Sequence, residues 1–162
     1  MFELSNIQMV RGGRTILSIS SLRISDSGLT IVLGHNGSGK STLVSLLSGQ
    51  QAPDSGTITL NKCNISHYKS RERAKKIAFL PQKLPASAGL TVKELVRLGR
   101  FPWRGTLGRW NRKDDEIITM AMEKAGVLPF ADTLADDLSG GETSTCLGCN
   151  VTGSTITYFN FR

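Results

Sequence analysis

The chain has 162 residues, of which 39% are hydrophobic and 20% are charged, the balance typical of one globular domain. Its apolar runs are too short to span a bilayer, and its N-terminus lacks the basic and then apolar pattern of a signal peptide. The formal net charge is +7, but Lys and Arg are spread along the chain, with acids near several of them and no RNA- or DNA-binding signature. We therefore expect a cytoplasmic location and no nucleic-acid partner.

The first predicted elements are a strand, a turn and a helix. Residues 28–34 (GLTIVLG) form a short apolar run ending in Gly, which is typical of a buried strand. Residues 40–49 place Leu43, Leu46 and Leu47 at helical spacing before Gly49. A Gly-rich turn joins the two elements.

Two further strands are predicted next. Residues 52–61 indicate a turn followed by an alternating strand, and residues 75–82 indicate a strand that Pro81 stops. The chain therefore has an α/β pattern up to this point.

Helical periodicity dominates the following segment. It extends from residues 91–100 through residues 114–127, and Asp114 and Asp115 are placed to favour the N-terminus of the second helix. We expect a helical insert after the α/β part, with no internal repeat.

The turn between the first strand and helix matches the pattern G-x-x-x-x-G-K-[ST], in the strand and helix context that supports such a match. Its glycines allow successive backbone N–H groups to surround phosphate oxygens, and the helix N-terminus favours the same anion. Lys40 is expected to reach the β- and γ-phosphates, and the Ser41 hydroxyl to ligate Mg²⁺. The candidate cradle is Gly34, His35, Asn36, Gly37, Ser38, Gly39, Lys40, Ser41 and Thr42.

Two more motifs follow. Gln82 ends a predicted strand, where its side chain could reach the metal or an attacking water. Taken alone, a Gln in a turn is more often solvated. Later, Leu138, Ser139, Gly140, Gly141 and Glu142 (LSGGE) combine a hydroxyl and Gly N–H groups at the predicted start of a helix, which could form a second anion site or a simple helix cap.

Together these motifs resemble those of the ATP-binding cassette ATPases, in the family's order and with a helical segment between the last two. The resemblance covers residues 1–142 and implies a P-loop NTPase core over residues 1–83 and a helical signature subdomain over about 84–142. Residues 92–110 look particularly like the ATPases that import ferric siderophores, the hydroxamate type above all. Importers of vitamin B12 and haem carry a similar surface.

The resemblance also implies partners. Two such subunits pair head to tail beneath a membrane permease, at the cytoplasmic face of the membrane, and ATP lies between them. Lys40, Ser41 and Gln82 are then expected to act in cis, and the signature at residues 138–142 in trans. The segment from Phe101 to Trp110 and the loop after Gln82 are expected to face the permease.

One position departs from the family pattern. Where the family usually stacks an aromatic side chain on adenine, the aligned positions are Val10 and Arg11. A guanidinium can stack on a base as well, so Arg11 is the candidate for this contact.

The tail at residues 143–162 is atypical. The family continues from the signature into an apolar strand that ends in Asp and Glu, followed later by a switch His, but no acid follows Glu142 and both histidines lie upstream. One extra base after the Glu142 codon would explain the tail, because the shifted frame can encode a helix and a strand ending in Asp-Glu. On this hypothesis Cys146 and Cys149 are accidents of translation.

Three expectations follow from the tail. The central sheet is incomplete, and residues 155–161 (TITYFNF) are the segment that suits a strand there. The chain is expected to be aggregation-prone, and to bind ATP without hydrolysing it at a significant rate. The alternative function is a regulatory module that holds nucleotide without hydrolysis.

Overall fold

The computed structural model describes residues 1–25, 29–79, 89–104, 108, 110–138 and 157–159. The chain forms two compact units, Met1–Arg73 and Ala74–Arg162. We call them the first and the second unit and describe each separately. The predicted boundary after residue 83 lies outside the described residues and stays a prediction.

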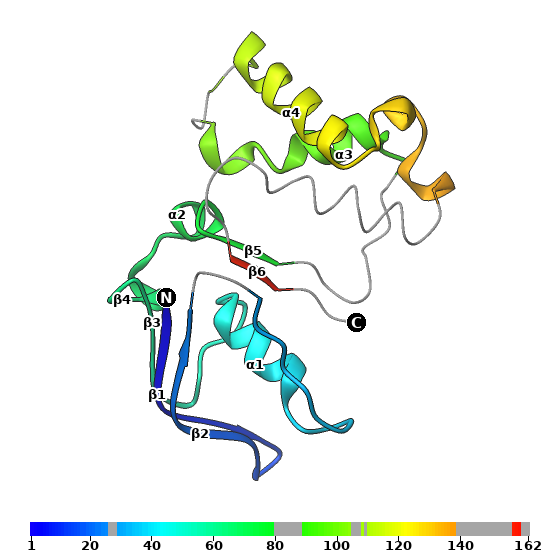
Figure 1. The fold of residues 1–162 in the computed structure, drawn as a ribbon. Helices are drawn as coiled ribbons and strands as arrows, with labels where there is room; N and C mark the ends of the chain where they lie inside the picture. The colour runs from blue at the N-terminus through cyan, green and yellow to red at the C-terminus, as the bar shows by residue number, and fades with distance from the viewer. Residues whose placement is uncertain (26–28, 80–88, 105–107, 109, 139–156, 160–162) are drawn as a thin grey trace. The chain divides into compact units, whose positions relative to one another are not determined.

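The first unit is built on an antiparallel sheet of four strands (Figure 1). The strands are β1 (Phe2–Arg11), β2 (Arg14–Ile24), β3 (Ser55–Leu60) and β4 (Cys63–Asn64), in the order β2-β1-β3-β4. β3 confirms the strand predicted within residues 52–61. The hairpin of β1 and β2 was not predicted, although two glycines at its turn, both with positive φ, favour such a connection.

A bulge in β1 shifts the alternation of its buried side chains. Phe2 and Leu4 are buried, then Ile7 and Met9 are buried, because Asn6 adopts the left-handed φ of 51° and the pairing with β3 is irregular there. Gly56 of β3 lies against this bulge: a Cβ on Gly56 would be 2.3 Å from the Asn6 carbonyl oxygen. Only glycine therefore fits the close approach of these two strands.

The predicted helix at residues 40–49 is confirmed as α1 (Lys40–Leu47), whose Leu43, Val44, Leu46 and Leu47 are buried. After β4 come a short 3₁₀ helix, η1 (Ile65–His67), and α2 (Ser70–Ala74). The boundary between the two units falls within α2, after Arg73.

The predicted strand at residues 28–34 is wrong. Residues 29–34 form no strand, and the side chains of Leu29 and Leu33 are both 87% exposed. A strand needs neighbours that bond its backbone, and no described strand pairs with this segment. The apolar character of the run alone therefore did not decide its conformation.

The second unit contains a parallel pair of short strands. β5 (Ile77–Phe79) confirms the strand predicted at residues 75–82, and it pairs with β6 (Thr157–Phe159) in the register Ile77 to Thr157. β6 also confirms a strand within residues 155–161. The described strands form two separate sheets, which agrees with the expectation of an incomplete central sheet.

The helical part of the second unit confirms both predicted helices, α3 (Val92–Leu98) and α4 (Arg112–Lys124), which pack together. Short 3₁₀ helices, η2 (Phe101–Trp103), η3 (Leu128–Phe130) and η4 (Ala135–Asp137), complete it. Their shared core contains Val92, Leu95, Val96, Ile118, Ala121, Met122, Val127 and Ala135. No helix in the described part of the chain is long and apolar enough to cross a membrane.

Side-chain caps fix where α3 and α4 begin. Thr91 and Glu94 form a reciprocal capping box, and the Thr91 backbone N–H and hydroxyl hydrogen bonds lower the pKa of Glu94. The Asn111 side chain accepts from the Asp114 N–H at 2.9 Å. Asp114 and Asp115 do lie in the first turn of α4, as predicted.

Asp114 also has a partner that the sequence did not reveal. Its carboxylate accepts from the Arg100 guanidinium at 3.1 and 3.2 Å, and both side chains are largely buried.

Close by in the sequence, the guanidiniums of Arg97 and Arg104 lie 4.1 and 4.0 Å from the ring centre of Trp110. Both guanidiniums are therefore within cation–π distance of the Trp110 ring.

Candidate functional site

The phosphate-loop candidate is in the first unit, directly before α1. Gly37 and Gly39 have φ values of 83° and 85°, in the left-handed region that favours glycine. The Ser38 N–H donates to the His35 carbonyl oxygen at 3.2 Å, which closes a tight turn. The loop residues are exposed or half-buried. The backbone therefore forms the open, Gly-dependent turn that a phosphate cradle requires.

At two of these positions a side chain larger than that of glycine would also collide with neighbouring atoms. A Cβ on Gly34 would lie 2.5 Å from the Ser38 hydroxyl oxygen, and a Cβ on Gly39 would lie 3.0 Å from the Ile16 carbonyl oxygen. Leu17 lies 3.1 Å from the same position. β2 thus lies against the loop at Gly39, a contact that the sequence did not reveal because this strand was not predicted.

Lys40 closes over the loop. Its ammonium donates to the carbonyl oxygens of Gly34 and His35 at 2.7 and 2.8 Å, and lies 3.5 Å from the Ser38 hydroxyl. The charge is therefore held at the loop rather than in solvent. An anion in the loop would meet this ammonium directly.

The N-terminus of α1 is free of side-chain capping. Gly39 is its N-cap residue, so no N-cap side chain bonds the first turn. The first N–H groups of a helix lack internal partners, and they carry the positive end of the helix dipole. Ser41 is exposed and Thr42 is half-buried beside them. These donors suit a phosphate, and the Ser41 hydroxyl is an oxygen ligand of the kind that Mg²⁺ takes.

The other predicted site residues are not brought to this loop by any described contact. Gln82 and residues 139–142 lie outside the described residues, as do Cys146 and Cys149. Leu138 packs against the helical core of the second unit. Arg11 is exposed, and its guanidinium donates to Gln51 at 3.3 Å. The roles assigned to these residues, and the reading-frame hypothesis, stay predictions.

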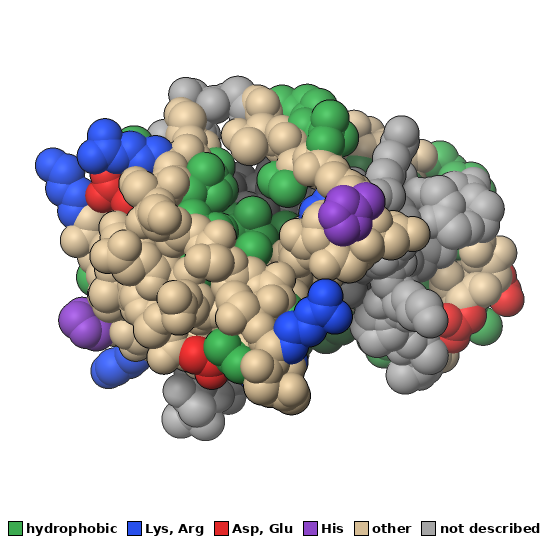
Figure 2. Space-filling view, turned by 90° about the horizontal axis from the view of Figure 1, so that it is seen from below, with side chains coloured by type: hydrophobic (Ala, Val, Ile, Leu, Met, Phe, Trp, Pro, Cys, Tyr) green, Lys and Arg blue, Asp and Glu red, His purple; other side chains and the backbone are tan. Residues whose placement is uncertain are grey.

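Lys and Arg side chains do not form one continuous patch on the face shown in Figure 2. They occur there in separate small groups, with Asp and Glu side chains also present. This distribution is that of an ordinary solvated surface.

Comparison with known proteins gives a consistent result. The sequence model of the ABC transporter family matches residues 17–147. The ferric enterobactin transport ATP-binding protein of Escherichia coli (strain K12) is 38% identical over 131 residues, 81% of this chain and 48% of that protein. The iron(3+)-hydroxamate import ATP-binding protein of Bacillus subtilis (strain 168) is 37% identical over 81% of this chain and 49% of its own length. The chain thus spans about half the length of these curated relatives.

Solved structures agree at the level of fold. A dimeric ATP-binding cassette in a post-hydrolysis state, bound to ADP and phosphate, has a TM-score of 0.80 at 22% identity, over 94% of this chain and 69% of that one. An inward-facing metal-chelate type ABC transporter has a TM-score of 0.75 at 23% identity, over 93% of this chain and 55% of that one. These likenesses confirm the predicted P-loop fold. With a family model that covers most of its length and a phosphate-loop geometry to match, this chain belongs to the ABC transporter family.

Proposed function

We propose that this chain binds ATP with residues 34–42. The observation that carries the proposal is the loop itself: two left-handed glycines, an uncapped helix N-terminus and the Lys40 ammonium lie around one exposed turn. Backbone N–H groups would hold the phosphates, and Lys40 would neutralise their charge. Membership of the family supports nucleotide binding at this loop.

The test is retention of labelled Mg-ATP by the 162-residue chain and its Lys40→Ala variant. We expect the variant to bind at least about tenfold more weakly, because it loses charge-assisted hydrogen bonds to phosphate. Lys113→Ala is the matched control, since it removes an equal charge from an exposed position in α4. Equal retention by wild type and Lys40→Ala would contradict the proposal.

We infer that Mg²⁺ is held in part by Ser41, which lies exposed in the first turn of α1. The bound ion would neutralise phosphate charge, and the residue's contribution would be to orient it. Ser41→Ala should reduce the gain in ATP affinity that Mg²⁺ gives, while leaving metal-free binding unchanged. An unaltered Mg²⁺ dependence would remove Ser41 from the metal site.

We further propose that the protein is the ATP-binding subunit of an importer. Both relatives described above are named as transport or import proteins, and they give no support to a regulatory module. A second ATP-binding subunit and a membrane permease would be the partners. In that arrangement the signature at residues 138–142 would contact ATP held by the other subunit, at the cytoplasmic face of the membrane. Co-purification of the protein with a permease from its own membrane tests this, and recovery of the protein free of membrane proteins would count against it.

The cargo proposed is a ferric siderophore of the hydroxamate type. The support is similarity to the hydroxamate importer and other iron-chelate importers. Deletion of the gene, followed by uptake of radiolabelled iron as hydroxamate, catecholate or haem complexes, separates the options. Loss of hydroxamate uptake alone is the expected result. Loss confined to haem would overturn the choice of cargo but not the proposed ATP site.

For the polypeptide of residues 1–162, we propose binding with negligible hydrolysis. A carboxylate that activates the attacking water is needed after the signature, and no acidic residue follows Glu142 in this sequence. Phosphate release well above that of Lys40→Ala would contradict this. Resequencing across the Glu142 codon tests the proposed reading-frame cause.

A further inference from the structure

A cluster of two arginines and two aromatic rings spans the end of α3 and the segment before α4. The Cζ atoms of Arg97 and Arg104 are 4.1 and 4.0 Å from the centre of the Trp110 ring. The Cζ atom of Arg104 is also 6.0 Å from the centre of the Phe101 ring. We call these four residues the arginine cluster. Because both Cζ atoms lie about 4 Å from one point, they are at most about 8 Å apart, so two positive charges are held close together.

Neither charge of the cluster forms an ion pair in the described part of the chain. Asp114, an acid close to the cluster in the sequence, pairs with Arg100 instead. The Glu94 carboxylate accepts hydrogen bonds from Thr91, which lower its pKa more than the charge of Arg97 does. The acids on either side of the cluster in the sequence are therefore used elsewhere.

The two guanidiniums are also partly removed from water. Arg97 and Arg104 are half-buried, and their Nε atoms are buried without an acceptor among the described groups. Arg104 donates to the Gly108 carbonyl oxygen through another nitrogen, which leaves its charge unpaired. A half-buried cation without a counter-charge is costly, and an incoming anion offsets that cost. The cluster thus favours a negatively charged ligand.

The surface around the cluster suits a protein rather than a free ion. Phe101 is 55% exposed beside Arg104, and Trp, Phe and Arg are the side chains enriched at protein interfaces. Residues 95–113 contain six Arg and Lys and no Asp or Glu. Exposed aromatic surface next to unpaired cations therefore indicates a partner that carries an acidic group beside apolar ones.

An anionic bilayer fits this surface less well. Asp115, Glu116 and Glu123 are exposed on α4, in the same unit as the cluster. Their negative charges weaken the attraction to an extended anionic surface. A single carboxylate side chain needs only the cluster itself.

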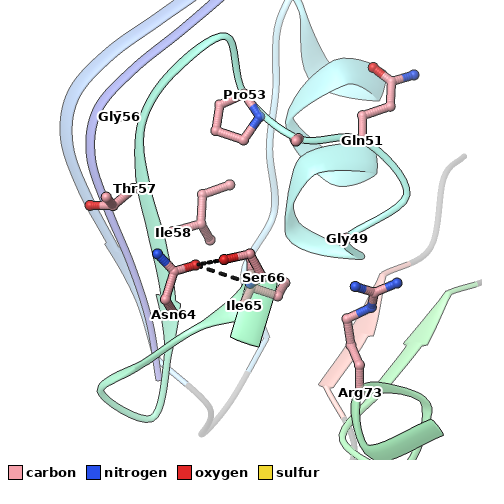
Figure 3. Close-up of a pocket in the computed structure, with 11 residues that line it drawn as sticks. Gly49, Gln51, Pro53, Gly56, Thr57, Ile58, Asn64, Ile65, Ser66 and Arg73 are labelled. Atoms are coloured by element: carbon pink, nitrogen blue, oxygen red, sulfur yellow. Dashed lines mark hydrogen bonds between the residues drawn. The ribbon is translucent and has the colours of Figure 1, made fainter. Parts of the chain in front are cut away.

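The cavity of the first unit lacks this combination (Figure 3). Its volume is about 290 Å³, it lies at the C-terminal end of α1, and Arg73 is the one charged side chain among its lining residues. The Asn64 amide oxygen at its wall accepts from Ser66. A lone arginine at the negative end of a helix dipole does not make an anion site, whereas the cluster brings two unpaired guanidiniums together.

We propose that the arginine cluster binds the carboxylate of an Asp or Glu side chain of a protein partner. Each carboxylate oxygen accepts at about 2.8 Å from a guanidinium nitrogen, so one carboxylate can bridge two guanidiniums whose Cζ atoms are this close. Phe101 would contact apolar side chains next to the acid. The partner that the proposed function supplies is the importer's permease. The identity of the partner therefore rests on that function, but the recognition of a carboxylate does not.

The experiment is a titration of the 162-residue chain carrying Trp103→Phe, in which Trp110 is the one remaining tryptophan. The probes are a blocked peptide, Leu-Glu-Leu-Leu-Glu-Leu, and its counterpart with Gln in place of both Glu. We expect a saturable change in indole emission with the Glu peptide, and binding of the Gln peptide at least about tenfold weaker, because charge-assisted hydrogen bonds are lost. This comparison uses one folded chain throughout. Equal binding of the two peptides, or binding of neither, would overturn the proposal.

Two variants then test whether the peptide binds at the cluster. Arg97→Gln and Arg104→Gln should each weaken binding of the Glu peptide at least about tenfold. Arg112→Gln is the matched control: it removes an equal charge from an exposed position at the start of α4 and should bind like the parent chain. Unaltered binding in both cluster variants, with unchanged circular dichroism, would count against the assignment. A shift of emission by vesicles of phosphatidylcholine and phosphatidylglycerol, but not by the Glu peptide, would assign the cluster to a lipid surface and overturn the proposal.

The importer arrangement is tested separately by co-purification with the permease. We expect Arg97→Gln to be recovered with the permease less than the wild type, and Arg112→Gln to be recovered equally. If the wild type itself is not recovered with the permease, the proposed function fails. If Arg97→Gln is recovered as well as the wild type, the present inference fails and the proposed function stands.

Discussion

The helical segment at residues 91–138 buries apolar side chains in a core, whereas the segment at residues 29–33 leaves its apolar side chains exposed. In the helical segment, α3 and α4 bond their own backbones, begin at side-chain caps and share a buried core. Among the residues that the structure describes, no strand pairs with residues 29–33, and Leu29, Ile31, Val32 and Leu33 are exposed. The helices α3 and α4 are therefore specified largely by residues close to them in the sequence, whereas a strand at residues 29–33 would need a pairing strand from elsewhere in the chain.

The largest effect is expected in the sheet, where distant segments meet most closely. Gly56→Ala should destabilise the first unit by about 3 kcal/mol or more, because a left-handed residue gains a Cβ that collides with the Asn6 carbonyl. Thermal unfolding followed by circular dichroism measures it. Gly13→Ala is the matched control: its φ is also positive, but nothing lies within 4 Å, so only the conformational cost of about 1 kcal/mol should remain. Equal losses would show that contact with Asn6 is unimportant.

The next largest effect is expected at the buried ion pair of the helical segment. Asp114→Ala leaves the Arg100 charge buried and unpaired, and should lower the stability of the second unit by about 3 kcal/mol. Glu116→Ala removes a carboxylate from an exposed pair with Arg112 in the same helix and should cost less than about 0.5 kcal/mol. Hydrogen exchange of α3 and α4 reports the change. A similar small effect for both variants would contradict the importance of the buried pair.

A smaller effect concerns pH. Hydrogen bonds from Thr91 hold the pKa of Glu94 below its usual value in the folded chain. Folded Glu94 therefore binds a proton less tightly than unfolded Glu94, so its contribution is fully present above the ordinary pKa and is lost as the pH falls through the lowered one. Exchange protection at the start of α3 should decrease in acid. Glu94→Gln should flatten this dependence, and an unchanged pH profile would argue against the capping box.

The smallest effect is expected at residues 29–33. Leu33→Ser should change the stability of the chain by no more than about 0.5 kcal/mol, because the side chain is already 87% exposed. It should also reduce aggregation, since it removes exposed apolar surface. Light scattering and thermal unfolding measure the two effects. A large loss of stability would mean that this leucine is buried in solution, and would end the contrast between the two segments.

The sequence was most informative where the determinants are contiguous. The phosphate loop was predicted because Gly34 to Ser41 lie together in one motif, and α3 and α4 because their caps and apolar positions are local. The hairpin of β1 and β2 was missed, although Gly12 and Gly13 gave a signal. The Arg100–Asp114 pair and the meeting of Asn6 with Gly56 could not be predicted, because each depends on the path of the backbone between distant residues.

Trp110, with two arginine guanidiniums over its ring, gives the chain a built-in spectroscopic label. Trp103 and Trp110 are the two tryptophans of the sequence, and both lie in the second unit. Indole emission excited at the red edge of its absorption therefore reports on this unit alone. When the unit unfolds, Trp110 loses its contacts with the guanidiniums of Arg97 and Arg104, which changes the emission. Far-ultraviolet dichroism follows both units. A difference between the two melting curves thus measures, without any labelling, whether the units unfold together.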